Sequence, residues 1–378
     1  MTWCIGLMSG TSLDGIDGVL CDFGKEPWRA AAAVHVAMPP SLHDELLSLN
    51  VPGNDELHRA ALAANALTLL YVEAVHRLLR ETAIDARQVA AIGAHGQTVR
   101  HRPGAFDGVG YTLQLMNGAL LADRCGIDVI CDLRSADVCA GGQGAPLVPA
   151  FHAAAFARAG QDVAVVNVGG IANITLLAAD GRVSGFDTGP GNMLMDGWIR
   201  RHRGLPFDSD GVWADSGQVQ SDLLCEMLAE AFFARKPPKS TGRDLFNERW
   251  LDDLLSRHVG QVDPVDVMAT LAELTARSIS DAVLGEAARL AELDICGGGS
   301  RNKHLMQRLS ALLPGTRVTT TAERGIEPDW VEAMAFAWFA HCHLTGRPAN
   351  LPDVTGARGS RVLGARYPAA RACKTDSD

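Results

Sequence analysis

Short apolar runs that end in polar, glycine-rich turns alternate with longer segments in which apolar residues recur at helical spacing. The chain opens on an apolar run over 2–8, a polar turn over 9–15 and a returning apolar run over 16–23, which together predict a β-hairpin. Further buried strands are predicted at 89–94, 111–115 and 127–131. Helical spacing predicts covering helices at 40–49 and 55–81. Strands that alternate with helices are typical of an α/β fold.

The segment 132–150 is rich in glycine and proline and is the best candidate for a domain boundary. We therefore expect a first α/β domain over 1–140 and a second over 141–378, with the C-terminal segment free to pack back on the first domain. The run 163–192 predicts three strands with a tight turn at Asp180-Gly181. Helices are predicted at 192–203, 218–234, 265–290, 303–312 and 329–344, the last of them capped through Pro328-Asp329.

Composition narrows the class of protein. At roughly 150 residues per domain, 378 residues give two or three domains, and 47% hydrophobic with 21% charged residues suits a large buried core. The net charge of −10 provides no basic field for nucleic acid or an anionic membrane surface. No run reaches the ~18 uncharged apolar residues of a membrane helix, and the first residues lack the basic region of a signal peptide, so we expect a cytoplasmic protein. Nine cysteines without a CxxC pair suit reduced thiols.

Three glycine turns each follow a predicted strand directly: Ser9–Gly15, Val168–Asn173 and Gly297–Gly299. Such turns present closely spaced backbone N–H groups that bind an oxyanion, although the first fits an ordinary hairpin turn equally well on shape alone. Together, on two halves of the chain, the three turns favour nucleotide binding. The patterns GxxxxGK[ST], GxGxxG, GxSxG and HExxH do not occur in the sequence, which argues against Walker, Rossmann, α/β-hydrolase and zincin sites.

Asp187 ends an apolar strand just before a glycine turn and a predicted helix. An aspartate in this position is usually a helix cap, but Asn192 is better placed to cap that helix. Asp187 would then be free to act as a general base at the edge of the sheet.

Other polar residues near the predicted strand ends each allow a functional and a structural interpretation. His95 fits a ligand-facing residue and a satisfied buried histidine equally well. Arg134 and Asp137 lie at the expected boundary, where a plain ion pair accounts for them. Glu332 begins the last helix, where an acid is usually a surface residue that the helix dipole favours.

Seven different short motifs occur along the chain between Gly6 and Pro368. In order they are GLMSGTSLDGIDG, AHGQT, DLRSADVCAGGQGAPLVP, NVGGIANIT, FDTGPGN, GGGSRN and VLGARYP. Together they resemble the anhydro-N-acetylmuramic acid kinase family, and the combination of GxMSGTSxDGxD with FDTGPGN is specific. The resemblance implies two ribonuclease-H-like α/β domains, as in the superfamily of sugar kinases, actin and heat-shock chaperone ATPases.

The resemblance also implies roles for the turns and for several side chains. ATP and Mg²⁺ are the implied cofactors, with the magnesium ligands unknown, and Asp187 matches the catalytic acid. The nucleotide loops would be Gly10, Thr11, Ser12, Leu13, Asp14, Gly15, Ile16 and Asp17, then Gly169, Gly170 and Asn173, then Gly297, Gly298 and Gly299. The sugar contacts would be Gln97, Thr98, Arg134 and Glu332.

The implied reaction joins hydrolysis to phosphoryl transfer. Water opens the 1,6-anhydro bridge of 1,6-anhydro-N-acetylmuramic acid while O6 takes a phosphoryl group from ATP, giving N-acetylmuramic acid 6-phosphate and ADP in peptidoglycan recycling. Two rivals stay open: an actin- or chaperone-like ATPase without a sugar acceptor, and an inverting glycosidase, which needs a second carboxylate ~6.5–9.5 Å from Asp187. The sequence leaves the oligomeric state open, a homodimer included.

Overall fold

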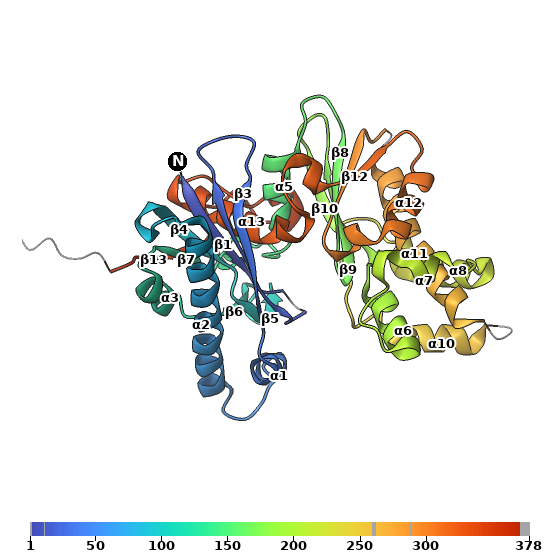
Figure 1. Ribbon diagram of the computed structural model, residues 1–378, viewed down its shortest axis with the longest axis horizontal. Coiled ribbons are helices and arrows are strands. Elements are labelled where there is room, and N and C mark those ends of the chain that lie inside the picture. The colour runs from blue at the N-terminus through green and yellow to red at the C-terminus, as the bar shows by residue number, and fades with distance from the viewer. Residues whose placement is uncertain (1, 11, 259–261, 288, 371–378) are drawn as a thin grey trace, which may run out of the picture. The chain divides into compact units, whose positions relative to one another are not determined.

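Two α/β units, each built on its own β-sheet, contain the residues that the structure describes (Figure 1). The computed structural model describes residues 2–10, 12–258, 262–287 and 289–370. Unit 1 holds the chain up to Phe151 and again from Trp330 onward, and unit 2 holds His152–Asp329. We expected a boundary at residue 140; the division between the units falls within helix α5 (Val148–Phe156).

Unit 1 is built on a six-stranded mixed sheet with the order β13-β7-β4-β1-β2-β3. Its strands are β1 (Trp3–Met8), β2 (Gly15–Asp22), β3 (Ala30–Ala37), β4 (Val89–Ala94), β7 (Val129–Cys131) and β13 (Ala365–Tyr367). The first three strands pair antiparallel in sequence order, whereas β4 pairs parallel with β1 and with β7. A separate hairpin is formed by β5 (Gln97–Pro103) and β6 (Gly110–Leu115).

Unit 2 repeats this topology in a five-stranded sheet with the order β10-β9-β8-β11-β12. Its strands are β8 (Val163–Val168), β9 (Ile171–Leu177), β10 (Val183–Pro190), β11 (Glu292–Cys296) and β12 (Arg317–Thr320). An antiparallel meander of the first three strands is again followed by two parallel strands on the other side of the first. The same strand order in both units confirms the expected pair of ribonuclease-H-like domains.

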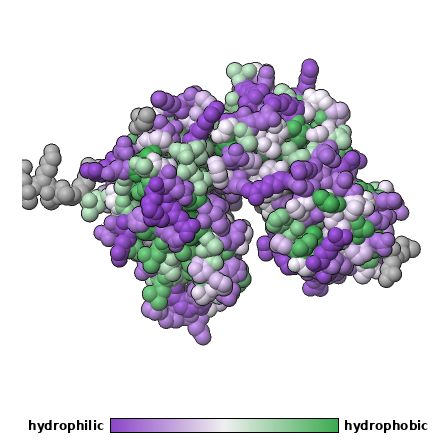
Figure 2. All heavy atoms as spheres, viewed as in Figure 1, coloured by the Kyte–Doolittle hydropathy of each residue, from purple (hydrophilic) through white to green (hydrophobic). Residues whose placement is uncertain are grey.

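The helices of unit 1 are α1 (Pro40–Ser48), α2 (Glu56–Thr82), α3 (Gly118–Cys125), α4 (Ser135–Cys139), α13 (Val331–Leu344) and α14 (Pro352–Thr355). Of these, α2, α3 and α13 pack against the six-stranded sheet. Buried residues of α2 recur three or four positions apart, at Ala63, Ala64, Leu67, Tyr71, Ala74, Val75 and Leu78. Among the described residues, α2 is the one helix with the length and hydropathy of a membrane span, and this apolar face packs into the core. Hydrophobic side chains also remain on its surface (Figure 2).

Helix α13 lies so close to the unit 1 sheet that two neighbouring strands need glycine beneath it. Gly6 of β1 and Gly93 of β4 are register partners. A Cβ atom on Gly6 would lie 1.8 Å from the carbonyl oxygen of Ala333, and one on Gly93 would lie 1.9 Å from that of Phe336. Since backbone atoms cannot yield as a flexible side chain does, these glycines set the depth at which α13 packs.

The helices of unit 2 enclose two apolar clusters, one against the sheet and one among the helices themselves. They are α6 (Met193–Arg203), α7 (Val212–Asp215), α8 (Ser221–Leu228), α9 (Ala231–Ala234), α10 (Glu248–Arg257), α11 (Pro264–Glu286) and α12 (Lys303–Leu312). Short 3₁₀ turns lie at Ala86–Gln88 in unit 1, at Ser209–Gly211, Gly298–Arg301 and Thr321–Arg324 in unit 2, and at Pro328–Trp330 where the units divide.

Several local expectations were wrong. The helix expected over 218–234 is broken, because Glu230 adopts an extended ψ of 130° between α8 and α9. Helix α10, which buries only Leu251 and Leu254, was not expected. The last helix begins at Val331, after a 3₁₀ turn, and not at a Pro328-Asp329 cap.

We expect Gly93→Ala to lower the free energy of unfolding by about 3 kcal/mol or more, because the methyl group meets the Phe336 carbonyl and forces α13 off the sheet. Urea unfolding measures this change. Gly53→Ala is the matched control, since its nearest neighbour is the flexible Arg59 side chain at 3.4 Å. Equal stability of the two variants would show that α13 does not pack as described.

Candidate active site

The first glycine turn joins β1 to β2 at one end of the unit 1 sheet. The Leu13 N–H donates to the Gly10 carbonyl at 3.3 Å, and Leu13 itself takes a positive φ of 58°. The Ser12 hydroxyl donates to Asp14 at 2.7 Å, and the Met38 N–H donates to the Asp14 carbonyl. Thr11 lies outside the described residues. The turn is thus longer and more irregular than a two-residue hairpin turn, and Ile16 anchors its far side in the core.

Carboxyl groups gather near this turn. Asp17, the last of the predicted loop residues, accepts a hydrogen bond from His35 at 2.8 Å. Burial raises the pKa of Asp17, and the neighbouring Asp14 adds to the rise while His35 opposes it. Burial likewise raises the pKa of Glu332, with Arg134 opposing and Asp17 adding to the shift. Glu332 is therefore no ordinary surface acid: it lies within unit 1, close enough to Arg134 and Asp17 for their charges to act on it.

His95 links the first turn to Arg134. Its Nδ1 atom lies 3.1 Å from the Ser9 carbonyl and its Nε2 atom lies 2.9 Å from Nη2 of Arg134. Since a carbonyl and a guanidinium face the two ring nitrogens, Nδ1 carries the proton and Nε2 accepts. Burial, with the Arg134 charge adding to it, lowers the pKa of His95 to about 3. His95 is thus a satisfied buried histidine and, at the same time, part of the cluster of predicted site residues.

Arg134 does not form the ion pair with Asp137 that its place in the sequence suggested. Its Nη1 donates to the Gly144 carbonyl at 2.8 Å, and burial lowers its pKa to about 10. Asp137 instead accepts from the backbone N–H of Gly144 at 2.7 Å and from the side chains of Asn350 and Thr355.

Gln97 and Thr98 begin β5 next to the same turn. Gln97 is 2% exposed, and its Nε2 donates to the Gly10 carbonyl at 3.1 Å. Its Oε1 is buried and has no hydrogen-bond partner among the described residues. The half-buried Thr98 accepts at 3.2 Å from Gln114. A buried amide oxygen without a donor is costly, so it suits a place where a ligand supplies the donor.

In unit 2 the two other glycine turns lie against each other. A Cβ atom on Gly299 would lie 2.3 Å from the Val168 side chain, and one on Gly297 would lie 2.3 Å from Oδ1 of Asn167. Gly297 also takes a positive φ of 74°. The backbone N–H groups of Gly191 and Asn192 donate to the carbonyls of Gly170 and Gly169 and pin the turn between β8 and β9. The turn between β8 and β9, the residues Gly191 and Asn192 after β10, and the turn 297–299 after β11 therefore pack together as one glycine-rich backbone cluster.

Asn192 does not cap α6 as expected. It occupies the cap position, but its side chain makes no capping hydrogen bond and instead donates at 2.9 Å to the carbonyl of Val168. The amide is thus used to hold the second glycine turn, a requirement that the local sequence does not reveal.

Asp187 lies on the edge strand β10, opposite Asn173 of the second glycine turn. Its Oδ2 accepts from the backbone N–H of Thr241 at 2.9 Å, and its own N–H donates to the Lys239 carbonyl. Burial raises the pKa of Asp187, and the Thr241 N–H opposes the shift. No ion pair to Asp187 is found within the described part of the chain, and its Oδ1 makes no hydrogen bond there.

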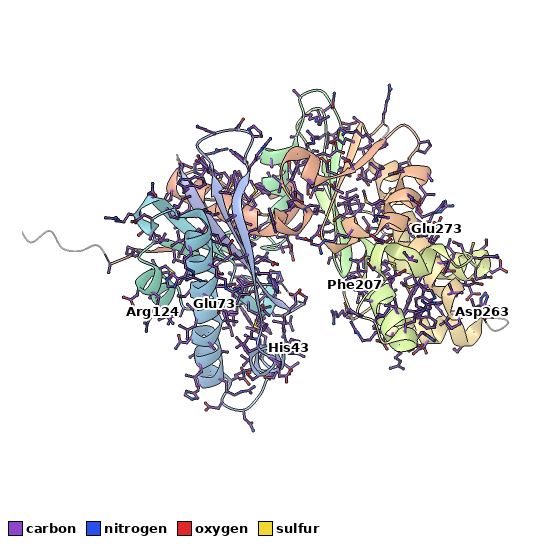
Figure 3. The ribbon with its side chains drawn as sticks, in the orientation of Figure 1. His43, Glu73, Arg124, Phe207, Asp263 and Glu273 are labelled. Atoms are coloured by element: carbon purple, nitrogen blue, oxygen red, sulfur yellow. The ribbon has the colours of Figure 1, made fainter. Side chains whose placement is uncertain are left out.

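Two strongly buried glutamates of unit 2 differ from the half-buried Asp187. Glu273 of α11 (Figure 3) accepts from Arg308 and Arg277, and these arginines lower its pKa against the effect of burial. Glu292 of β11 is held by Arg324 and other arginines. A paired carboxylate is a poor base because its negative charge is already neutralised. Asp187, by contrast, has no arginine partner and keeps Oδ1 without a hydrogen bond in the described part of the chain.

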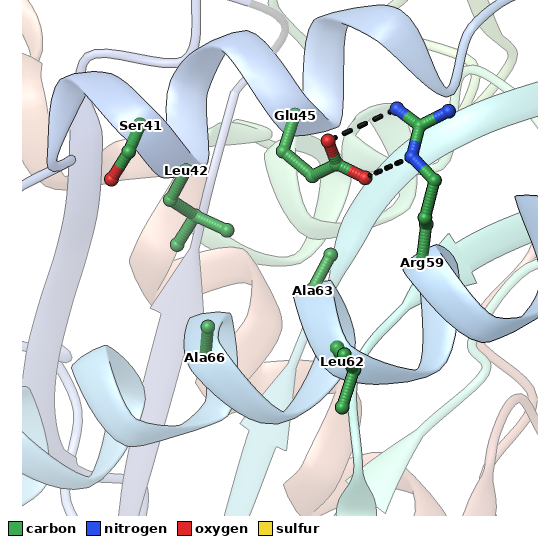
Figure 4. Close-up of a pocket in the computed structure, with 7 residues that line it drawn as sticks. All are labelled: Ser41, Leu42, Glu45, Arg59, Leu62, Ala63 and Ala66. Carbon is green, nitrogen blue, oxygen red and sulfur yellow. Dashed lines mark hydrogen bonds and ion pairs between the residues drawn. The ribbon is translucent and has the colours of Figure 1, made fainter.

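A surface pocket of about 400 Å³ lies apart from these residues, between α1 and α2 of unit 1 (Figure 4). Its lining is Ser41, Leu42, Glu45, Arg59, Leu62, Ala63 and Ala66, and the Glu45–Arg59 ion pair borders it. None of the predicted site residues lines it, so the pocket is not the site.

Comparison with known proteins identifies the chemistry that this arrangement serves. The family model of anhydro-N-acetylmuramic acid kinase matches residues 2–369. The chain belongs to this family. An anhydro-N-acetylmuramic acid kinase of Variovorax paradoxus is 56% identical over 97% of this chain and 98% of its own length, and that of Pseudomonas putida is 52% identical over 98% and 100%. As a member of the family, the chain is an ATP-using kinase of amino-sugar metabolism in cell-wall recycling.

The solved structures to which the chain is similar are more distant in sequence. A ROK family glucokinase from Streptomyces griseus, in complex with glucose and AMPPNP, covers 90% of this chain at 13% identity with a TM-score of 0.40. The activator of 2-hydroxyisocaproyl-CoA dehydratase from Clostridium difficile, with bound ADPNP, covers 91% at 12% identity with a TM-score of 0.45.

Two features of this kinase were not foreseen from the sequence. The segment around Lys239 and Thr241 contacts Asp187 through backbone atoms, which leave no signature in side-chain type. Arg366, from the last family motif, forms an ion pair with the buried Asp128 that ties β13 to the chain next to β7. Among the described residues, the ion pair of Arg366 therefore serves a structural role.

The neutral state of His95 gives this kinase a measurable acid sensitivity. Folding lowers the pKa of His95 from its ordinary value of 6.5 to about 3. Between these pH values the unfolded chain binds a proton at His95 and the folded chain does not. Stability is therefore lost as pH falls from 6.5 toward 3, by about 1.4 kcal/mol per pH unit for this one group. We expect His95→Gln, which keeps an acceptor for Arg134 but cannot titrate, to weaken this dependence.

Urea unfolding of the wild type and the variant between about pH 7 and 5 measures the difference. His43→Gln, on the surface of α1 (Figure 3), is the control. An identical pH dependence for wild type and His95→Gln would mean that His95 is not buried in the neutral form.

Proposed function

We propose that Asp187 is the general base of a reaction that opens the 1,6-anhydro bridge of 1,6-anhydro-N-acetylmuramic acid and phosphorylates O6 with ATP. The products are N-acetylmuramic acid 6-phosphate and ADP. The observation that carries the proposal is the half-buried Asp187 carboxylate, which has a single backbone donor on Oδ2, no ion pair in the described part of the chain, and a place beside the second glycine turn.

One base is sufficient for both bond changes. Asp187 takes a proton from water as the water oxygen attacks the anomeric carbon, and the bond between that carbon and the bridge oxygen breaks with oxocarbenium character. The bridge oxygen, now O6, attacks the γ-phosphorus as the bond to ADP breaks. No general acid is needed, because the phosphoryl group replaces the proton that the leaving oxygen otherwise takes.

The glycine turns suit the binding of ATP phosphates. Backbone N–H groups bind negative charge without side-chain bulk, which the loop 10–17 of unit 1 and the turns 169–173 and 297–299 of unit 2 provide. We assign the turn 169–173 to phosphate contacts and the turn 297–299 to adenosine contacts. The first phosphate loop comprises Gly10, Thr11, Ser12, Leu13, Asp14, Gly15, Ile16 and Asp17.

Mg²⁺ fits the residues near the first turn. The ion prefers one or two carboxylates together with phosphate oxygens and water, and Asp14 and Asp17 each have one oxygen engaged by a neighbour. These two carboxylates would hold the ion through its water shell. When bound, the ion neutralises charge on the phosphoryl oxygens. Among the described residues, no group of three or more His, Cys, Asp or Glu side chains is placed to hold a metal ion.

The sugar contacts are proposed for Gln97, Thr98, Arg134 and Glu332, which lie around the first turn in unit 1. The unpartnered Oε1 of Gln97 suits a hydroxyl or amide donor of the sugar. We further propose that the enzyme acts in the cytoplasm, without nucleic acid or membrane partners, and leave a homodimer to be tested by its mass in solution.

We expect Asp187→Asn to lower sugar-dependent ADP release by about 10²- to 10⁴-fold, because an amide cannot take the proton from water. ATP affinity should be unchanged, since the glycine turns are intact. Asp180→Asn, at an exposed turn where Asp180 pairs with Arg182, is the matched control and should keep full activity. Near-normal turnover of Asp187→Asn would remove Asp187 from the role of base.

The same assay without sugar separates the rival functions. ATP consumption that does not depend on 1,6-anhydro-N-acetylmuramic acid would favour an actin- or chaperone-like ATPase. Bridge opening that ignores nucleotide would favour a glycosidase.

A further inference from the structure

Asp187 lies on the edge of its sheet, and the segment Lys239–Thr241 covers that edge. The Asp187 N–H donates to the Lys239 carbonyl at 3.1 Å, and two residues further on the Thr241 N–H donates to Oδ2 of Asp187 at 2.9 Å. Both hydrogen bonds fall on one residue of β10. The segment, here called the strap, therefore fixes the backbone and the carboxylate of Asp187 together.

The strap is anchored by the ammonium group of Lys239. Its Nζ donates to the carbonyls of Phe232 and Phe233 at 3.4 and 3.3 Å, beside α9. The same Nζ lies 4.7 Å from the ring centroid of Phe232, within the range of a cation–π contact. Phe232 is 2% exposed and packs against the fully buried Phe246, so the anchor point is rigid.

Geometry at β10 itself makes a rigid strap necessary. The register of β9 with β10 is irregular between Asp187 and Gly189, where Gly189 takes a φ of 152°. A Cβ on Gly189 would lie 2.7 Å from the Phe233 ring. The ladder that normally orients a strand residue is thus interrupted immediately after Asp187, and the strap supplies hydrogen bonds on the opposite edge.

We propose that Lys239 and Thr241 are positioning residues for Asp187: Lys239 anchors the strap, and the Thr241 N–H holds the carboxylate with Oδ1 directed to the water that it activates. This inference rests on the proposed role of Asp187 as the base. Neither residue touches the reacting atoms through its own side chain. Both act through Asp187: Lys239 by anchoring the strap, and Thr241 by its backbone N–H.

The strap also sets the charge state of the base. Burial raises the pKa of Asp187, and the Thr241 N–H is the group that lowers it. Charged groups on the elements that pack against β10 are Glu230, Arg235 and Lys239 around α9, and Asp266, Glu273, Arg277, Asp281 and Glu286 on α11. Glu273 is paired with Arg277, and the N–H of Thr241 is the group that lowers the pKa of Asp187 against the effect of burial.

The test compares Lys239→Met with Lys236→Met in the full-length enzyme. Lys236 is an exposed lysine just before the strap, between α9 and Lys239. The two variants therefore lose the same charge through the same change of side chain. We expect Lys239→Met to lower kcat about 10- to 100-fold, as misplacement of a catalytic group does, with the KM for ATP unchanged. The acid limb of its pH profile should move to higher pH, because loss of the Thr241 donor raises the pKa of Asp187.

A second pair tests the backbone donor directly. Thr241→Pro removes the N–H, whereas Thr241→Ala keeps it. Circular dichroism and ATP binding report whether each variant is folded. We expect the proline variant alone to show the lower kcat and the shifted acid limb.

A third readout does not depend on activity. Carbon NMR of the carboxyl groups, with the Asp187 signal assigned by its loss in Asp187→Asn, follows the titration of Asp187 in the wild type and in Lys239→Met. An unchanged titration, or a wild-type kcat and pH profile for Lys239→Met, would overturn the strap proposal. Loss of ATP affinity in proportion to kcat would also overturn it, since that result indicates general damage to the fold. Absence of sugar-dependent turnover in the wild type would instead refute the proposed function, and the titration would still decide the strap.

Discussion

The proposed chemistry depends on keeping one half-buried carboxylate ionised without a cation beside it. A cation would satisfy the charge and weaken the base, and burial alone would protonate it. In place of a cation, Asp187 has one backbone N–H, that of Thr241, which donates to Oδ2 and leaves Oδ1 without a hydrogen bond among the described residues. Glu273 and Glu292 are more deeply buried than Asp187 and are stabilised by arginines, whereas Asp187 has no such partner among the described residues.

Close packing of backbone against backbone is the second constraint. In unit 2, Gly297 and Gly299 let one glycine turn lie against the strand that leads into the other, and in unit 1 Gly6 and Gly93 let α13 lie on the sheet. The first pair brings N–H groups together where phosphate is proposed to bind. The second brings Glu332, at the start of α13, into unit 1 where the charges of Arg134 and Asp17 act on it.

Elements with a strong local pattern were predictable from the sequence. The strand over 89–94 and the helix over 303–312 agree with the structure at both ends, because an apolar run and an asparagine cap define them locally. The three glycine turns were also located correctly, whereas the strand that was expected to end at Asp187 continues to Pro190. The family resemblance added the chemistry that spacing alone left open between a nucleotide site and ordinary turns.

What the sequence could not provide depends on contacts between distant segments. Thr241 meets Asp187 across 54 positions through its backbone N–H, which every non-proline residue carries. Asn192 looked like a helix cap because its neighbours on the chain suggest one, yet a carbonyl of β8 competes for its amide. Glu332 looked exposed because an acid at the start of a helix is usually a surface residue, yet it is half-buried and the charges of Arg134 and Asp17, from distant parts of the chain, act on it.

The account requires that a single base suffices, and this holds only when the bridge oxygen itself accepts the phosphoryl group. An isotopic oxygen label in the 1,6-anhydro bridge of the substrate tests that requirement directly. After turnover with ATP, the account predicts the label in the linkage between C6 and phosphorus. Label on the anomeric carbon would show that the other bridge bond breaks, and would contradict the account.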